Sequence, residues 1–406
     1  MTSIMRGVRV LEVAAWTFVP AAGAILADWG ADVLKVEHPE TGDPQRGLAT
    51  LGVLPGGGKS VSFMMQGPNR GKRSVAINIA TDDGREVLYR LAETSDVFLT
   101  SYLPSVRERL RIDVDDIRAC NKKIIYVRGH GQGAKGPERD KGGFDGASYW
   151  ARGGVADTLT PPGAPQLVGA RPGIGDVMGG LNLAGGISAA LFSRERTGEA
   201  TVVDASLLST AMWQLQTDVA MTSEFGLDDI VRFQGNGKVV NPLVGNYRTK
   251  DDRWVFLNIM QSDRFWVDFC QHIGRVDMVD DERFRDATAR AEHSDACLHE
   301  IADTFASRTL SEWRDALATM QGVWAPVQRV PELRNDEQVI ANGYLGRVTD
   351  ADGSELDLVG APVQFDEQPH ELRPAPEHGQ HTDEVLLELG WSWDEIVALK
   401  VSGAVG

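Results

Sequence analysis

One aspartate lies in a run of small residues that could do chemistry. Residues 173–186 read GIGDVMGGLNLAGG, with Asp176 among six glycines. A carboxylate at a helix start is kept ionised by the helix N-terminus, and free backbone N–H groups there can hold an oxyanion. The pattern therefore indicates a reactive carboxylate that a ligand can approach closely. A purely structural role as the N-cap of the helix explains the same spacing and stays open at this point.

Two glycine-rich stretches imitate nucleotide-binding motifs but fail on their spacing. VLPGGGKS at 53–60 ends like a P-loop, yet its first glycine position is occupied by Val53. In the stretch around Asp176, the third glycine of GxGxxG falls on Met178. The sequence therefore disfavours an ATPase and a nicotinamide or flavin enzyme, and 53–60 is better interpreted as a surface loop or lid.

Composition excludes several other classes of protein. The 406-residue chain has a formal net charge of −17, so a nucleic acid or an anionic membrane would bind against its field. Its three cysteines form no CxxC pair and its histidines form no HExxH motif, so no metal site is predicted. The start of the chain has no signal-peptide core, and the uncharged run 13–27 is too short to span a bilayer. We expect a cytoplasmic protein with neither nucleic-acid nor membrane partners.

The elements that must position Asp176 follow from hydrophobic periodicity. Short runs rich in Val and Ile alternate with helical patterns over the first 130 residues, which predicts an α/β fold with a parallel sheet. The predicted strands are 8–14, 32–37, 74–79, 96–100 and 124–129, and the predicted helices are 20–29 and 81–93. From about residue 226 the spaced glycines and later helical segments indicate a second, smaller domain. The Pro-rich segment 360–385 is predicted to be an ordered loop that returns to the first domain.

Five segments of the chain resemble the class III CoA-transferase family, also called the CaiB/BaiF family, which includes formyl-CoA and carnitine CoA-transferases and the α-methylacyl-CoA racemases. They occur in the family's order and together cover nearly the whole sequence. The segments are GVRVLEVAAWTFVPAAGAILADWGADVLKVEHPETGD (7–43), NRGKRSVAINIATDDGREVLYRLAETSDV (69–97), GHGQGAKGPERDKGGFD (129–145), GDVMGGLNLAGGISAALFSRERTGEATVVDASLL (175–208) and GQHTDEVLLELG (379–390).

The resemblance implies a fold and an assembly. It implies a large Rossmann-like CoA-binding domain formed by residues 1–224, a small α+β domain at 225–325, and a C-terminal segment at 326–406 that returns to the large domain. It also implies an obligate homodimer in which two chains interlock like links.

The same resemblance implies a reaction. A CoA-transferase of this family moves CoA from an acyl-CoA donor to a carboxylic acid, with CoA as co-substrate and without a metal. Asp176 would be the nucleophile that carries CoA as an aspartyl thioester, with its glycine amides stabilising the oxyanions, and Asp145 of the GGFD segment would be the acidic residue beside it.

Further site residues follow from the same motifs. Lys72 and Arg109 are expected to face the nucleotide phosphates of CoA. The remaining CoA-binding residues implied are His38, Asn69, Arg70, Gly71, Ser101, Tyr102, Gly143 and Phe144. The acyl group would contact Thr17, Phe18, Gly235 and Asn236, the last two in a glycine loop that suits a hinge. Formyl-CoA transferases have Gln where this chain has Thr17, which argues against a formyl or oxalyl substrate.

Two alternatives to a CoA-transferase stay open on the sequence. The racemases and epimerases of the family carry a His immediately before the Asp of the GGFD-like motif, where this chain has Phe144. A two-base racemisation would then require another acid–base group, and His130 is the candidate. A non-catalytic relative that binds a CoA thioester is the other alternative.

Overall fold

The parallel strands expected from the sequence are present and form one sheet. The computed structural model describes residues 3–49, 63–231, 239–350 and 353–406. These divide into two compact units, the first formed by Met1–Thr160, Pro165–Leu227 and Glu337–Gly406, and the second by Pro161–Ala164 and Asp228–Asp336. Each unit is described by itself.

The first unit contains a six-stranded, fully parallel sheet in the order β3-β2-β1-β4-β5-β6. Its strands are β1 (Arg9–Val13), β2 (Asp32–Glu37), β3 (Arg73–Ala76), β4 (Val97–Thr100), β5 (Ile125–His130) and β6 (Val202–Ser206). The first five confirm the predicted strands. The edge strand β6 was not predicted, because its run VVDAS is short and largely half-exposed.

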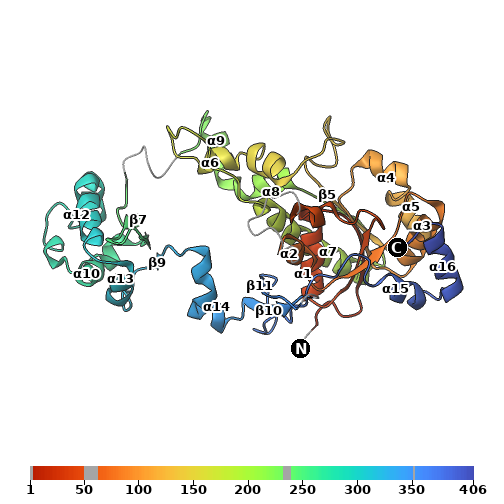
Figure 1. The fold of residues 1–406 in the computed structure, drawn as a ribbon. Helices are drawn as coiled ribbons and strands as arrows, with labels where there is room; N and C mark the ends of the chain where they lie inside the picture. Colours follow the sequence, from red (N-terminus) through yellow and green to blue (C-terminus); the bar gives the residue numbers. More distant parts are fainter. Residues whose placement is uncertain (1–2, 50–62, 232–238, 351–352) are drawn as a thin grey trace. The chain divides into compact units, whose positions relative to one another are not determined.

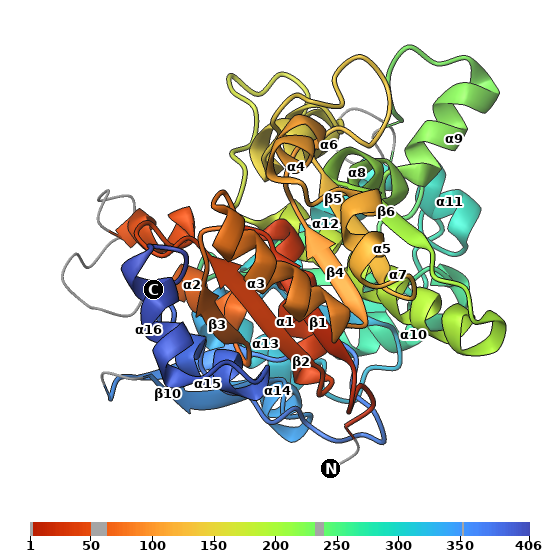
Figure 2. The same cartoon turned by 90° about the vertical axis from the view of Figure 1, so that its right-hand side faces the viewer.

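Helices cover both faces of this sheet. The helices of the first unit are α1 (Phe18–Asp28), α2 (Phe63–Asn69), α3 (Asp82–Glu93), α4 (Pro104–Leu110), α5 (Val114–Cys120), α6 (Val155–Leu159), α7 (Ile174–Thr197), α8 (Leu207–Gln214), α9 (Gln216–Phe225), α14 (Glu337–Ala341), α15 (Thr382–Glu388) and α16 (Trp393–Val401). One face packs on α1 and α7, and the other on α3, α5, α15 and α16. Figure 2 shows α3 and α5 in front of the strands. The neighbours Val10 and Leu11 of β1 point to opposite faces, as strand geometry requires.

The glycines after Asp176 have a packing role, because α1 and α7 approach closely (Figure 1). A Cβ added to Gly179 would lie 2.4 Å from the Phe18 ring, and one added to Gly180 would lie 2.6 Å from the Cβ of Ala21. Side chains at these positions would push the two helices apart. With 24 residues, α7 is apolar and long enough to cross a membrane by composition, and it packs here as a core helix against the sheet.

The C-terminal part of the chain, Glu337–Gly406, belongs to the first unit. After α14 it forms the antiparallel hairpin of β10 (Leu345–Thr349) and β11 (Glu355–Val359). Residues 360–376, which have almost no regular structure, then follow the first unit and bond to it, for example through Ala361 N–H to Asp28. At the end of the chain, Gly406 N–H donates to Ala76 O beside β3.

The second unit has its own sheet and core. Its strands β7 (Val244–Arg248), β8 (Trp254–Asn258) and β9 (Trp324–Pro326) are antiparallel. Its helices are α10 (Ser262–Ile273), α11 (Ala287–Glu292), α12 (Ser294–Ala306) and α13 (Leu310–Ala316). The core is built around aromatic residues such as Phe269, Phe305 and Trp313. A capping box formed by Thr309 and Glu312 opens α13.

Candidate active site

Asp176 lies in the first turn of α7 without capping it. The N-cap position belongs to Gly173, whose φ of 75° is left-handed and therefore suits glycine. Asp145, in a π-helical turn over Asp145–Ala151, accepts a 3.0 Å hydrogen bond from Gly175 N–H. The N-cap explanation for Asp176 is therefore wrong. The N–H of Gly175, which was expected to be free for an oxyanion, is instead bonded to Asp145.

The surroundings of Asp176 raise the pKa of its carboxyl group. Burial, and then the nearby negative charge of Asp145, raise the pKa of Asp176 to about 7. Burial also raises the pKa of Asp145, against the opposing effect of its backbone hydrogen bonds. A half-buried carboxylate with a raised pKa is poorly solvated when ionised, which makes Asp176 a stronger nucleophile than an ordinary surface aspartate.

Asp176 opens into a cavity of about 510 Å³ at the carboxyl ends of the strands, where parallel sheets bind ligands. The structure brings seven other predicted site residues to its lining: Phe18, His38, Ser101, Tyr102, Gly143 and Phe144, with His130 from the alternative interpretation. Thr17 is not among the lining residues, and its hydroxyl donates to Gln45. Gly235 and Asn236, like the loop 53–60, lie outside the described residues.

Aromatic side chains form one wall of the cavity. The rings of Trp16 and Phe144 meet edge to face with 5.5 Å between centroids. Phe18 lies against Gly179 of α7 and also against Gly129 of β5, where an added Cβ would be 3.0 Å from its ring. The wall therefore joins the helix that carries Asp176 to the strand that carries His130.

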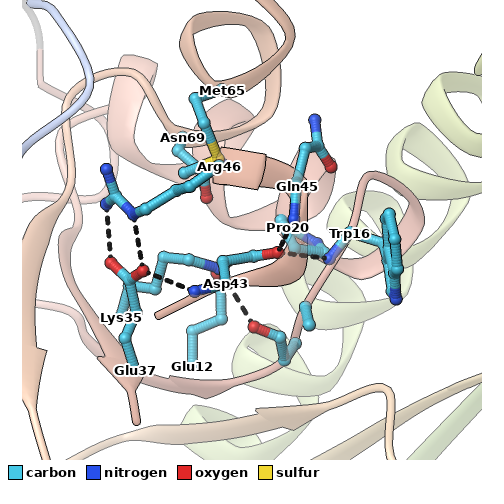
Figure 3. Close-up of polar contacts among 12 residues, drawn as sticks. Glu12, Trp16, Pro20, Lys35, Glu37, Asp43, Gln45, Arg46, Met65 and Asn69 are labelled. Atoms are coloured by element: carbon cyan, nitrogen blue, oxygen red, sulfur yellow. Dashed lines mark hydrogen bonds and ion pairs between the residues drawn. The ribbon is translucent and has the colours of Figure 1, made fainter. Parts of the chain in front are cut away.

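The backbone of Trp16 is held in an uncommon conformation. Its φ of 70° is left-handed, which is costly for a bulky residue. Its N–H donates to Asp43 Oδ1 at 3.2 Å, and Asp43 also accepts from Gln45 N–H and pairs with Lys35 at 2.8 Å. Figure 3 shows Asp43 beside Trp16 and Gln45. Asp43 was not predicted as a site residue, since nothing in its local sequence indicates its distant partners.

Lys72 does not reach the cavity. Its Nζ is fully buried, 2.7 and 2.8 Å from the Glu12 carboxylate, and it also donates to Pro20 O and Asn69 Oδ1. Burial, with the nearby charge of Lys35, lowers the pKa of Lys72 to about 7 against the opposing effect of Glu12. The predicted phosphate contact of Lys72 is therefore corrected, because all its described partners lie inside the fold.

The three residues before Lys72 also contact other parts of the fold. Asn69 is buried, Arg70 pairs with Asp28 at 2.6 Å, and Gly71 N–H donates to carbonyls of the returning C-terminal segment. None of the four residues lines the cavity, so the structure does not bring them to the predicted CoA site. Arg109 is exposed in the last turn of α4, one turn beyond Val106 in the cavity lining, and its phosphate contact stays a prediction.

A second polar group of the cavity is His130, at the end of β5. Its Nε2 lies 3.2 Å from Asp204, and Arg128 holds the same carboxylate at 2.7 and 2.9 Å. Although burial opposes it, the contacts with His130 and Arg128 lower the pKa of Asp204 below its ordinary value. The sequence contains His130 within RGHGQ but gives no sign of its pairing with Asp204, 74 residues later.

No group of three or more His, Cys, Asp or Glu residues suited to a metal occurs among the residues that the structure describes. What the site offers is one basic carboxylate, an aromatic wall, and a histidine oriented by a carboxylate. This arrangement suits nucleophilic attack on an acyl carbonyl.

Comparison with known proteins agrees with this chemistry. The family model described as CoA-transferase family III matches residues 5–382. The chain is 33% identical to (R)-2-hydroxy-4-methylpentanoate CoA-transferase of Clostridioides difficile over 99% of both chains. It is 31% identical to cinnamoyl-CoA:phenyllactate CoA-transferase of Clostridium sporogenes over 98% of this chain and 96% of that one.

The fold agrees as well. A CaiB/BaiF family protein from Brucella suis superposes with a TM-score of 0.81 at 24% identity, covering 96% of this chain and 100% of that one. With a family model that spans most of the sequence and full-length relatives above 30% identity, the chain belongs to CoA-transferase family III.

Proposed function

We propose that this CoA-transferase works through an aspartyl-CoA thioester on Asp176. In the first half-reaction an Asp176 oxygen attacks the donor thioester carbonyl, and the C–S bond breaks to give a mixed anhydride and CoA thiolate. The thiolate then attacks the Asp176 carboxyl carbon and releases the donor acid as a carboxylate. The acceptor carboxylate runs the same two steps in reverse. No net proton is taken up, and one thioester replaces another, so neither ATP nor a metal is required.

The observation that carries this proposal is the placement of Asp176. It is a carboxylate with a raised pKa, at a helix N-terminus, opening into the cavity at the carboxyl edge of the sheet. Because Asp145 takes the first-turn amides, the Asp176 carboxylate is not committed to capping the helix. The CoA moiety is proposed to lie along His38, Ser101, Tyr102, Gly143 and Phe144, with its phosphates toward Arg109.

The proposed acceptor is a 2-hydroxy monocarboxylic acid with a bulky apolar side chain. Both relatives above act, by their names, on acids of that type. The aromatic wall suits an apolar side chain. Among the described residues that line the cavity there is no Lys or Arg, so the second carboxylate of a dicarboxylic acid would meet no cation there.

The test is CoA exchange with a panel of acyl-CoA donors and acids. Mixing the enzyme with donor alone should produce a hydroxylamine-sensitive thioester, and the modified peptide should contain Asp176. Asp176→Ala should abolish both the thioester and the exchange while still binding acyl-CoA. Solvent deuterium should not enter the α-position of the acyl group, as it would with a racemase. Exchange by Asp176→Ala at the wild-type rate would contradict the proposal.

We also propose that the protein acts as a homodimer. Large apolar side chains are exposed on α7, α8 and α9, and α9 buries none of its residues within the chain. The exposed residues include Phe192, Met212, Trp213, Val219 and Phe225. Apolar surface of this kind marks an interface in stable proteins. Mass photometry at nanomolar concentration tests the proposal, and a stable monomer would contradict it.

A further inference from the structure

The Asp204–His130 pair has no part in the aspartyl thioester cycle, although His130 shares the cavity with Asp176. The His130 side chain is only 2% exposed, and the cavity is the open space that it borders. A buried polar ring in a binding cavity is costly unless both of its nitrogens find partners. Among the described residues only Nε2 has one, which is Asp204.

Chemistry fixes which nitrogen carries the proton. Asp204 is held as a carboxylate by Arg128 through two hydrogen bonds, and a carboxylate only accepts. Nε2 of His130 must therefore carry the hydrogen that it shares with Asp204. In the neutral ring Nδ1 is then left as an acceptor, which is the polar atom that His130 can offer to a bound molecule.

Three other polar side chains of the cavity are already engaged. Glu37 accepts from Arg46 and Ser74, and Asp43 accepts from the backbone of Trp16 and Gln45. Ser101 Oγ accepts from Ala15 N–H. In its neutral form, His130 therefore retains one ring nitrogen that can accept a hydrogen bond from a ligand in the cavity.

Phe18 sets where that acceptor lies relative to the nucleophile. Its ring packs against Gly179, one turn after Asp176 on α7, and against Gly129, the residue before His130 on β5. Asp176 and His130 therefore approach the cavity from the two elements that Phe18 bridges. An acid whose carboxyl carbon is at Asp176 has its α-carbon one bond further into the same cavity, which Phe18 and His130 also line.

We infer that His130, oriented by Asp204, is a specificity residue that accepts a hydrogen bond from the hydroxyl group on the α-carbon of the acid substrate. This inference rests on the proposed transfer of CoA to 2-hydroxy acids. The 2-hydroxyl donates its hydrogen to Nδ1 while the apolar side chain of the acid lies along the aromatic wall. A site built to bond a hydroxyl discriminates strongly against the analogue that lacks it, because the buried acceptor is then left unpaired.

The experiment compares two acceptors that differ only in this hydroxyl, (R)-2-hydroxy-4-methylpentanoate and 4-methylpentanoate. Both are measured with the fastest acyl-CoA donor of the panel, and kcat/KM is determined for each. The wild type should prefer the hydroxy acid by roughly a hundredfold or more. His130→Phe should lower that preference at least tenfold, through loss of kcat/KM for the hydroxy acid alone. His130→Gln keeps an acceptor group and should retain part of the preference, and it also serves where His130→Phe folds poorly.

Each other result overturns the inference. Equal losses for both acids would show that His130 acts on CoA or on the fold, and an unchanged preference in both variants would show that it does not contact the hydroxyl. If the wild type used the two acids equally, the enzyme would not recognise the 2-hydroxyl group, although the proposed CoA transfer would still stand. A wild type that forms the Asp176 thioester but uses neither acid would overturn the proposed acceptor class, and the role of His130 with it.

Discussion

Asp145 accepts a 3.0 Å hydrogen bond from the backbone N–H of Gly175, at the start of the helix that carries Asp176, the proposed nucleophile. This contact separates two tasks that one aspartate could have combined. Asp145 satisfies the helix N-terminus, and Asp176 in the next position is left to react. The negative charge of Asp145 also adds to burial in raising the pKa of Asp176 to about 7.

The first prediction concerns the pH dependence of thioester formation. Because the pKa of Asp176 is raised to about 7, the carboxylate is protonated and unreactive well below that pH. The rate of aspartyl-CoA formation from donor alone should rise from pH 5 to pH 7 and level off near pH 8. Rapid mixing with mass detection of the modified peptide measures it. A rate that is flat across this range would mean an ordinary aspartate pKa.

Replacing Asp145 should move that profile. Asp145→Asn keeps an oxygen for Gly175 N–H but removes the charge that helps to raise the pKa of Asp176. The midpoint of the pH–rate curve should therefore shift to lower pH. The same rapid-mixing assay measures the shift, with thermal unfolding as the control for the helix N-terminus. A midpoint that stays in place, or moves to higher pH, would argue against coupling between the two carboxylates.

The raised pKa of Asp176 also has a consequence for stability. The folded protein binds this proton up to about pH 7, whereas an unfolded aspartate releases it near pH 3.9. Stability is therefore lost as the pH rises between these values, and the full cost is present above pH 7. Asp176→Asn should raise the melting temperature at pH 8, and the gain should vanish by pH 4. A variant that melts below the wild type at pH 8 would contradict this.

Lys72 and Arg109 should separate in their effects, although the same role was expected of both. Lys72→Met leaves Glu12 without its closest partner in the interior, and breaking a buried pair costs about 3–5 kcal/mol. Urea unfolding should show this loss. Arg109→Met removes an exposed side chain, so it should leave stability unchanged and raise KM for acyl-CoA. If the Lys72→Met enzyme were as stable as the wild type and had a raised KM for acyl-CoA, the predicted contact of Lys72 with the CoA phosphates would be supported after all.

The fold was accessible from the sequence because its signals are local. Strands such as Val97–Thr100 read as apolar runs, and Thr81 stands at the start of a helical pattern that it does cap. The burial of charged side chains, by contrast, depends on partners that are distant in the sequence. Lys72 looks like a surface cation in NRGKRS, and its partner Glu12 looks like a strand residue in VRVLEV. Only the parallel pairing of β1, β2 and β3 brings the two together in the interior.

The difference between local and long-range signals also explains which residues of the candidate site could be proposed from the sequence. Asp176 could be proposed from the sequence because its glycine surroundings are contiguous. Asp43, which holds the left-handed backbone of Trp16, and Asp204, which orients His130, act on residues 27 and 74 positions away. No spacing rule links such pairs before the fold is known. Sequence can therefore single out a candidate such as Asp176, but not the residues that shape and orient the site around it.

The glycines of α7 offer a matched test of how closely α1 must approach. At Gly179 an added Cβ would lie 2.4 Å from the Phe18 ring, whereas at Gly185 it would meet nothing within 4 Å. Alanine in an exposed helix interior gains about 1 kcal/mol over glycine, so Gly185→Ala should stabilise the protein slightly. Gly179→Ala should instead cost about 1–3 kcal/mol by overpacking.

The effect on activity should differ between the two variants as well. Because Phe18 also lines the cavity, Gly179→Ala displaces an aromatic wall residue and should raise KM for the acid more than KM for the acyl-CoA donor. Gly185→Ala should leave both constants unchanged. Urea unfolding and steady-state kinetics on the pair measure the two effects. If Gly179→Ala matched Gly185→Ala in stability and in both KM values, the close contact between Phe18 and α7 would have no energetic or functional weight.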